Sequence, residues 1–360
     1  NPQAKIALLG CQAQIQREEL LDLENVYWVV GNERKMQFAE ILEQSFHTNT
    51  PQVLTPVIKR DSFTIEQAGI DRRHTRANLK IQDGCDFFCS FCVIPYARGR
   101  ARSRQFNDIL KEADQLIEAG HRELVLTGIN VGTYRYNNYS ITDVVTALLE
   151  LPGLDRLRLS SIEPTTIPDT LIELMNTDHR FCRYLHIPLQ SGSDTILKSM
   201  NRNYSAKDFA DFITGLHEKI PGICLGTDVM VGFPGETDEN FRETYDFLRE
   251  LPLAYFHVFS YSERPRAKSR HLPMQVPAEA VAERSRHLRE LSARKRQVFL
   301  NRQMGTVQEV LFEQQKKGWW TGLTDTYIRV KVQSEPSLKN QILKVKLHRK
   351  ENQEIKGFLI

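Results

Sequence analysis

Apolar runs of strand length alternate with stretches of helical period from Leu79 to Ser262. The six runs lie at 79–85, 123–130, 154–164, 183–191, 223–236 and 254–262. After the first run, apolar side chains recur at helical spacing until Gly120 supplies a stop: Phe106, Ile109, Leu110, Ala113, Leu116 and Ile117. Alternating strands and helices predict an α/β fold with a parallel sheet, and six units predict an incomplete (β/α)6 barrel. In such folds the reactive groups lie at the C-terminal ends of the strands.

The sequence predicts two further helices, one from a capping pattern and one from apolar spacing. Ser205 and Asp208 predict an N-cap with a variant of the capping box, before a helix that runs toward Gly222. After the fifth run, Phe241 and Leu248 belong to another helical stripe.

The last sixty residues alternate with period two, which predicts a small all-β domain. One face of the two alternating segments is apolar: Ile328, Val330, Val332, Leu343, Val345 and Leu347. The other face carries Arg329, Lys331, Lys344 and Lys346. Residues 302–360 hold eleven Lys or Arg against six Asp or Glu. The basic face is either a phosphate-binding surface or a set of solvated edge-strand lysines that discourage aggregation.

The first 74 residues give a weaker pattern. Residues 5–14 predict a buried strand that ends in a Gly-Cys turn, residues 32–46 predict a helix, and residues 48–76 predict a linker. We therefore divide the chain into residues 1–74, the barrel at 75–297 and the β-domain at 298–360.

The composition is that of an ordinary globular protein, with 41% hydrophobic and 26% charged residues. No apolar run approaches the roughly 18 residues that span a bilayer, so we expect no membrane association. The chain starts without a signal-peptide pattern, which predicts a cytoplasmic protein. Six cysteines in 360 residues indicate a reducing compartment, where clustered thiols bind metal or perform chemistry.

Three of these cysteines, Cys85, Cys89 and Cys92, share the loop after the first predicted strand. Three thiolates can hold three irons of a cubane cluster and leave the fourth iron open to another ligand. Structural zinc prefers four closed ligands. His74 or His121 would have to supply the fourth, and neither has a local metal-ligand spacing. The loop favours the iron–sulfur cluster.

The spacing in CDFFCSFC, with an aromatic residue before the last cysteine, resembles the loop of the radical S-adenosylmethionine (SAM) superfamily. The chain resembles the methylthiotransferase branch of that superfamily in GCDFFCSFCVIPYARGRARSR, LTGINVGTY, LSSIEP, LHIPLQSGSD and GTDVMVGFPGET. Its tail, with GTVQEVLFE and GLTDTYIRVKV, resembles the TRAM domain, a small RNA-binding β-barrel. The resemblance implies a radical SAM barrel between part of an N-terminal α/β methylthiotransferase domain and a C-terminal TRAM barrel.

Three substrate classes belong to this branch: isopentenyladenosine in tRNA, threonylcarbamoyladenosine in tRNA, and an aspartate of a ribosomal protein. YARGRARSR, TGINVGTY and LSSIEP most resemble the threonylcarbamoyladenosine enzymes. The isopentenyladenosine enzymes are the second reading, and the basic tail disfavours the ribosomal-protein reading. A non-catalytic RNA-binding scaffold is the alternative from another class, although a scaffold has no use for an open-iron cluster.

The resemblance also implies a mechanism. A [4Fe–4S] cluster on the three loop cysteines binds SAM at its open iron and cleaves it to a 5′-deoxyadenosyl radical, which takes hydrogen from C2 of the adenine. A second [4Fe–4S] cluster supplies the sulfur that carries the methyl group. The implied partners are the tRNA anticodon loop, with its target base flipped out, and an electron donor. We expect a monomer.

Cofactor contacts follow from the same resemblance and lie at the ends of strands two to five: Gly128, Asn130, Glu163, Gln190, Ser191 and Asp228. For each of them the alternative is a hydrogen bond that only stabilises a loop. Phe91 is expected beside the adenine of the cofactor, or in plain core packing.

Arg98, Arg100, Arg102 and Arg104 recur at period two just past the cluster loop. Such guanidinium groups suit an RNA backbone or the carboxylate of a threonylcarbamoyl group. The alternative is a loop in which they pair with nearby acids. With the basic face of the β-domain, they form the predicted RNA-binding set.

Near its start, the chain departs from the cysteine pattern of the family that it resembles. Cys11, in LLGCQAQ, matches the third of three cysteines that hold the second cluster, and the first two would lie upstream of Asn1. The sequence as given is therefore expected to cleave SAM without methylthiolating RNA. Cys182 and Cys224 do not fit the missing motif and are predicted to be buried structural thiols.

Overall fold

The computed structural model describes residues 1–360 except 2, 49, 66–68, 70–73 and 352–353. Its N-terminal part is a three-stranded parallel sheet in the order β1-β2-β3. The elements are β1 (Ile6–Leu9), α1 (Cys11–Gln16), a 3₁₀ turn (Arg17–Asp22), β2 (Val26–Val30), a 3₁₀ turn (Lys35–Gln37), α2 (Phe38–Ser45) and β3 (Gln52–Leu54). The linker predicted at 48–76 therefore contains a strand, and part of it lies outside the described residues.

Six parallel strands form the central part and confirm the incomplete barrel. They are β4 (Arg76–Lys80), β7 (Glu123–Thr127), β10 (Arg156–Leu159), β11 (Tyr184–His186), β12 (Cys224–Val231) and β13 (Tyr255–Ser260). They form two sheets, β10-β7-β4 and β11-β12-β13, and isolated bridges between Leu157 and Phe181 and between Ser161 and His186 join β10 to the second sheet.

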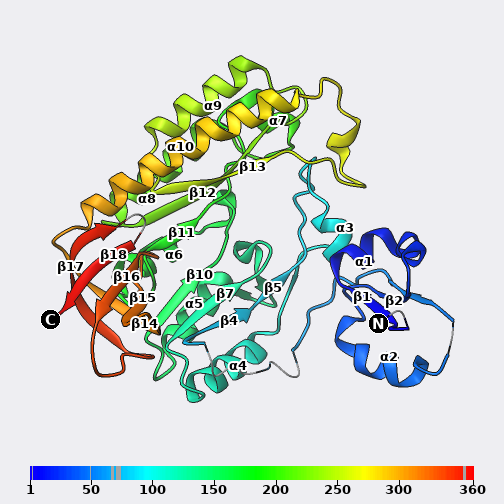
Figure 1. Cartoon of the computed structure of the whole chain (residues 1–360), viewed down its shortest axis with the longest axis horizontal. Coiled ribbons are helices and arrows are strands. Elements are labelled where there is room, and N and C mark those ends of the chain that lie inside the picture. Colours follow the sequence, from blue (N-terminus) through cyan, green and yellow to red (C-terminus); the bar gives the residue numbers. More distant parts are fainter. Residues whose placement is uncertain (2, 49, 66–68, 70–73, 352–353) are drawn as a thin grey trace.

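Helices cover the outer face of these strands, as Figure 1 shows. The long ones are α4 (Phe106–Glu118), α5 (Ile141–Leu149), α6 (Asp169–Thr177), α8 (Ala206–Lys219), α9 (Asp238–Glu250) and α10 (Ala278–Arg302). The capping box predicted for α8 is present: Asp208 N donates to Ser205 Oγ at 3.1 Å, and Ser205 N donates to Asp208 Oδ2 at 2.9 Å. The barrel's apolar core lies between the strands and these helices.

Short elements fill the loops at the strand ends. They are β5 (Gln82–Asp83), α3 (Ile94–Arg98), β6 (Arg102–Ser103), a 3₁₀ turn (Val131–Thr133), β8 (Arg135–Tyr136), β9 (Tyr139–Ser140), a 3₁₀ turn (Pro164–Thr166), α7 (Asp194–Ser199) and a 3₁₀ turn (Lys268–His271). The first predicted strand, 79–85, is thus divided. It begins at Arg76 and stops at Lys80, because Gln82 and Asp83 instead pair antiparallel with β6.

The C-terminal part is a closed five-stranded barrel, as the TRAM resemblance predicts. Its strands, in the order β14-β15-β16-β18-β17, are β14 (Val307–Lys316), β15 (Trp319–Leu323), β16 (Arg329–Gln333), β17 (Ile342–Glu351) and β18 (Glu354–Leu359). Five of the six predicted core residues are buried, and Leu343 packs against them while partly buried. Leu300, in the last turn of α10, packs into the same core. The boundary predicted at residue 298 therefore falls inside α10.

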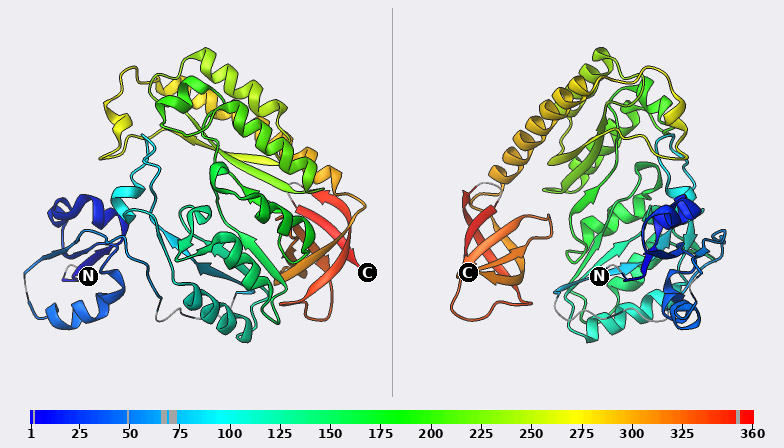
Figure 2. Two further views of the ribbon diagram at one scale, coloured as in Figure 1. Left: turned by 180° about the vertical axis from the view of Figure 1, so that it is seen from behind. Right: turned by 45° about the vertical axis from the view of Figure 1, so that its right-hand side comes forward.

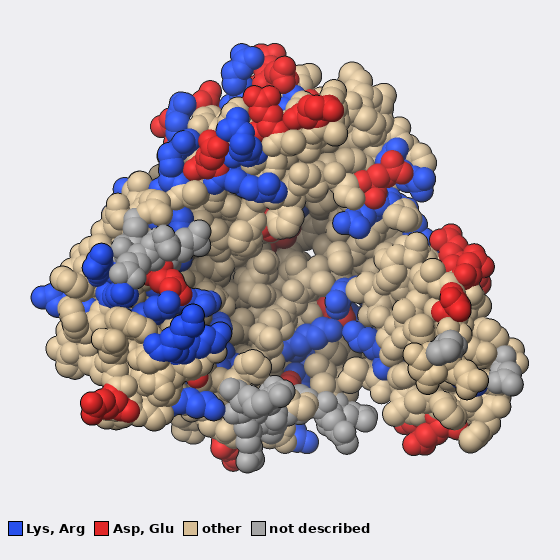
Figure 3. All heavy atoms as spheres, in the orientation of Figure 1, with Lys and Arg blue, Asp and Glu red and all other residues tan. Residues whose placement is uncertain are grey.

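The N-terminal part and the C-terminal barrel lie on opposite sides of the central strands in Figure 1 and in the left-hand view of Figure 2. Between them the space-filling view shows a hollow in the middle of the molecule (Figure 3). Among the described residues, no helix has the length and apolar character needed to cross a membrane.

Candidate active site

The cysteine loop leaves the C-terminal end of β4 and β5 and is held by backbone hydrogen bonds. Cys85 N donates to Gly99 O at 3.1 Å, and Cys92 N donates to Cys89 O at 3.0 Å. Gly84 precedes the loop with φ 73°, and a Cβ at this position would lie 2.1 Å from Arg100 O. Only glycine fits such a turn. The loop thus carries its three half-buried thiols on a fixed backbone.

The thiols share one electrostatic environment. Burial, the largest cause, and the neighbouring Cys89 and Cys92 together raise the pKa of Cys85 to about 11, although a hydrogen bond from the Phe87 backbone offsets part of the rise. Burial, and then the charge of Cys89, also raises the pKa of Cys92. Three thiolates this close are mutually destabilising unless a cation lies between them, and an iron–sulfur cluster supplies that positive charge.

This environment predicts slow alkylation of Cys85 in the cluster-free protein. A pKa raised from 9.0 to about 11 lowers the thiolate fraction at pH 8 about a hundredfold, and the greater nucleophilicity of the more basic thiolate offsets part of this loss. We expect iodoacetamide to label Cys85 at least about tenfold more slowly than a free cysteine peptide, with a rate that keeps rising to pH 10. Peptide mass spectrometry measures the rate, and the urea-unfolded chain is the control. A plateau below pH 9 would contradict the buried-thiol geometry.

Arg202 connects the cysteine loop to the end of β10, and the sequence patterns missed it. Its Nη1 lies 3.3 Å from Cys89 Sγ and 3.2 Å from Glu163 Oε1. The Tyr204 hydroxyl, which donates to Pro188 O at 2.7 Å, accepts from Arg202 Nη2 at 2.6 Å. Burial raises the pKa of Glu163, and the charge of Arg202 offsets part of that rise. Glu163 therefore shares Arg202 with the Cys89 thiol and already has a cationic partner.

Gly128 and Asn130 lie where β7 ends, and their surroundings fit a bound cofactor. A Cβ at Gly128 would lie 2.9 Å from Gln82 Oε1 and 3.0 Å from Gln82 Cβ, so a larger residue there would displace the Gln82 side chain. Asn130 is 1% exposed, and its Oδ1 accepts from Thr166 Oγ1 at 3.1 Å. Its Nδ2 is buried without a hydrogen-bond partner among the described residues. An orphaned buried donor costs free energy unless a ligand accepts from it.

The remaining residues predicted to contact the cofactor make contacts within the protein. Ser191 is fully buried and its Oγ lies 3.2 Å from Thr244 Oγ1, so it serves the packing of α9. Gln190 N donates to Asp228 O at 2.8 Å, which ties their two strands together. Phe91 is partly buried and packs with Ile196, Met200 and Phe233, the arrangement of the core-packing alternative.

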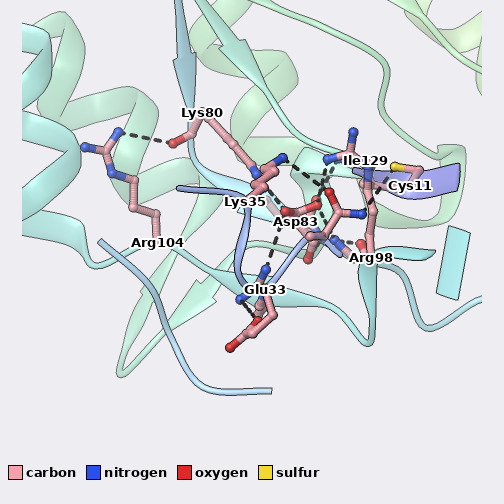
Figure 4. Close-up of polar contacts among 12 residues, drawn as sticks. Cys11, Glu33, Lys35, Lys80, Asp83, Arg98, Arg104 and Ile129 are labelled. Atoms are coloured by element: carbon pink, nitrogen blue, oxygen red, sulfur yellow. Dashed lines mark hydrogen bonds and ion pairs between the residues drawn. The ribbon is translucent and has the colours of Figure 1, made fainter. Parts of the chain in front are cut away.

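The four arginines after the loop all form ion pairs with aspartate or glutamate side chains, which is the alternative to RNA binding given above. Asp83 pairs with Lys80 at 2.6 Å, Arg98 at 3.3 Å and Arg102 at 3.7 Å (Figure 4). Burial alone would raise the pKa of Asp83, but the charges of Lys80 and Arg98 outweigh it and lower that pKa.

The two remaining arginines differ in exposure. Arg100 is half-exposed and pairs with Asp86 at 2.9 Å. Arg104 is 1% exposed and pairs with Asp108 and Glu112. Arg104 therefore does not offer its guanidinium to RNA.

Beside this loop lies a cavity of about 520 Å³. Three arginines and two aspartates line it, and it contains no large apolar side chain: Arg60, Arg102, Arg135, Asp61 and Asp86. Its lining suits a polar, anionic substituent better than a hydrocarbon one.

Cys11 lies where the N-terminal part meets the central barrel. It begins α1, and its Sγ accepts from Asn32 Nδ2 at 3.4 Å. Asn32 also donates to Ala97 O at 2.7 Å, and Arg98 lies next to Cys11 in Figure 4. The structure thus brings Cys11 to the helix that follows the cysteine loop. Cys182 and Cys224 are fully buried, as predicted.

The predicted basic face lies on the outside of the C-terminal barrel. Arg329, Lys344 and Lys346 are exposed, whereas Lys331 is half-buried and pairs with Glu354. Lys and Arg side chains gather over this barrel and around the hollow in Figure 3.

The sequence is similar to those of several known proteins. A family model described as the radical SAM superfamily matches residues 79–248. The chain is 35% identical over 356 residues to threonylcarbamoyladenosine tRNA methylthiotransferase MtaB of Bacillus subtilis, a match that covers 96% of this chain and 79% of that protein. It is 32% identical over 371 residues to tRNA-2-methylthio-N(6)-dimethylallyladenosine synthase of Acetivibrio thermocellus, covering 100% and 77%. Among solved structures, the methyltransferase TsrM of Kitasatospora setae shares 19% identity and a TM-score of 0.46, over 56% of this chain and 41% of that one.

Proposed function

Because the chain belongs to the radical SAM tRNA methylthiotransferases, we propose that it takes hydrogen from C2 of threonylcarbamoyladenosine next to the tRNA anticodon, the position that receives a methylthio group when a fully ligated second cluster is present. The observation that carries the proposal is the fixed loop with three half-buried thiols. Two observations favour this substrate over isopentenyladenosine. One is the higher identity to a relative named for it. The other is the arginine-lined cavity beside Asp86, which suits the threonyl carboxylate and offers no apolar wall for an isopentenyl group.

The chain's own residues have defined tasks in this proposal. Cys85, Cys89 and Cys92 hold a [4Fe–4S] cluster, which, when bound, supplies the electron for reductive cleavage of SAM. Asn130 Nδ2 would donate to the carboxylate of bound SAM, Gly128 would allow its close approach, and Glu163 would share its carboxylate between Arg202 and the ammonium of SAM. Cys11 contributes to a second cluster, and the exposed Arg329, Lys344 and Lys346 grip the tRNA through its phosphates. We further propose that the protein acts as a monomer with a separate electron donor.

Hydrogen transfer from the substrate base tests this function without requiring sulfur insertion. The substrates are anticodon stem-loops that carry threonylcarbamoyladenosine or isopentenyladenosine with deuterium at C2. We expect deuterium in the 5′-deoxyadenosine formed from the first substrate, at a rate at least about tenfold above the second, since a site that bonds a polar group of the substrate discriminates against an apolar analogue. Mass spectrometry of the nucleosides measures both label and methylthiolated product.

A Cys85→Ala protein and an unmodified stem-loop are the controls. Preferential labelling from isopentenyladenosine would replace the proposal with the second reading. Cofactor cleavage without label from either base would show that adenine C2 is not the target.

A further inference from the structure

Three side chains on neighbouring strands converge inside the barrel, apart from the cysteine loop. They are His186 on β11, Asp228 on β12 and His257 on β13. Asp228 and His257 are direct partners in the parallel register, and His186 lies opposite Gly226, two residues before Asp228. Because side chains two residues apart share a face of a strand, all three project to the same side.

Two of the distances between their ligand atoms are those of a shared cation. Asp228 Oδ1 lies 2.9 Å from His186 Nε2 and 3.3 Å from His257 Nδ1. One ligand atom from each of the three residues lies within 4.8 Å of the others. With metal–ligand bonds of about 2.1 Å, ligand atoms that subtend 90–109° at the metal lie about 3.0–3.4 Å apart.

These contacts are not explained by hydrogen bonds. Asp228 Oδ1 is buried, and no hydrogen bond reaches it from the part of the chain that the structure describes, although two imidazole nitrogens are close. The nitrogens therefore converge on the oxygen without directing an N–H at it. A buried carboxylate oxygen left in this state is costly, and a cation bound by all three atoms removes that cost.

The surroundings also supply what a metal-binding histidine needs. His186 Nδ1 lies 3.3 Å from the Tyr255 hydroxyl, which is itself 2.6 Å from the Tyr184 hydroxyl. A hydrogen bond on Nδ1 fixes the tautomer that leaves Nε2 free for a metal. His186 is buried and the His257 side chain is 58% exposed, so the group is closed on one side and open on the other.

We propose that His186, Asp228 and His257 bind a divalent first-row cation such as Zn²⁺ with nitrogen and oxygen ligands only. Three protein ligands leave at least one coordination position, on the exposed side of His257, for water or another ligand. This site is chemically distinct from the cysteine loop, which offers sulfur. The proposal does not depend on which modified adenosine the enzyme acts on.

Cobalt(II) titration of a cluster-free variant, Cys85→Ala/Cys89→Ala/Cys92→Ala, tests the site, because thiolate and imidazole ligation have different spectra. We expect one Co²⁺ per chain with visible d–d bands and without thiolate charge-transfer absorption, and a rise in Tm on binding. His257→Ala in this background is expected to abolish the d–d bands and the rise. Tyr255→Phe is expected to weaken binding about 10–100-fold, as for other residues that orient a metal ligand.

His271→Ala, at another exposed histidine, is the matched control and is expected to bind Co²⁺ normally. Circular dichroism establishes that each variant is folded. Absence of stoichiometric Co²⁺, spectra dominated by thiolate charge transfer, or binding that survives His257→Ala would each overturn the proposal. The same titration with Zn²⁺, followed by elemental analysis, gives the stoichiometry without relying on colour.

Discussion

Replacing Cys85 with alanine is expected to remove about four irons and the accompanying labile sulfide per chain, relative to the unmodified protein, after anaerobic reconstitution. A cubane cluster with only two protein thiolates left, Cys89 and Cys92, has lost a ligand that no nearby cysteine replaces. SAM cleavage should fall to background, whereas tRNA binding should change less than about twofold, because the basic face lies on the C-terminal barrel. Iron and sulfide analysis, 5′-deoxyadenosine formation and filter binding measure the three quantities.

Cys182→Ala is the matched control, since Cys182 is a fully buried thiol just before the N-terminal end of β11, whereas the cysteine loop follows the C-terminal end of β4. It should retain all of the iron and lose only stability, by about 1 kcal/mol for a small cavity. Full iron content in Cys85→Ala, or one zinc in place of iron, would rule out the radical mechanism. Joint loss of iron and tRNA binding would assign the cluster a structural role.

The sequence predicts the barrel well because its signal is local. The strands β7, β10 and β12 are buried on both faces and are covered by helices, so short apolar runs alternate with helical stripes. The division of the first strand was not predictable in this way. Gln82 and Asp83 turn to pair with Arg102 and Ser103, and that pairing depends on a loop closed about twenty residues later.

The site is only partly predictable, because its polar contacts join distant segments. Cys85, Cys89 and Cys92 reveal themselves by spacing alone. Arg202 lies 113 residues from the Cys89 thiol that it contacts, and no local pattern indicates it. His186 and His257 gave a weak signal: each is a polar residue in an otherwise apolar strand, and such residues face a barrel's interior.

For the four arginines after the cysteine loop, the sequence pattern identifies the residues but not their partners. Their period of two predicts that they share one side of an extended segment, but not what they meet there. Asp83 and Asp86 lie fewer than twenty residues before these arginines, and they form ion pairs with Arg98, Arg100 and Arg102. The spacing of the charges therefore identifies the segment. Only the folded structure shows whether its arginines are paired with acids or are available to bind RNA.

The C-terminal barrel is attached to the opposite end of the strands from the cysteine loop. Arg156, the first residue of β10, donates to Leu323 O at 2.9 Å and to Glu309 O at 2.8 Å. Arg158 donates to Asp325 O at 2.6 Å and lies 4.1 Å from the centre of the Tyr327 ring. Buried guanidinium groups thus satisfy backbone carbonyls of the C-terminal barrel and fix its position on the central one.

Arg158→Met is expected to destabilise the protein by about 3–5 kcal/mol. Arg158 is fully buried, and its Nε donates to Glu123 Oε1 at 2.7 Å. Removing the guanidinium leaves the fully buried Glu123 carboxylate facing Arg156 at 3.9 Å as its remaining cation, and breaking one partner of a buried ion pair costs about this much. Urea unfolding followed by circular dichroism measures the loss, and limited proteolysis after Arg302 reports release of the C-terminal barrel.

The double variant Arg158→Met/Glu123→Leu separates the buried charge from the contact itself. Because it removes both ions, we expect it to recover at least half of the lost free energy of unfolding while the C-terminal barrel stays sensitive to protease. Arg180→Met breaks an ion pair with Asp178 that is about one-third exposed, and should cost less than about 1 kcal/mol. If Arg158→Met cost no more than Arg180→Met, the C-terminal barrel would have to be held by its apolar contacts with α10 instead. The spacing between the basic face and the cysteine loop would then depend on that helix alone.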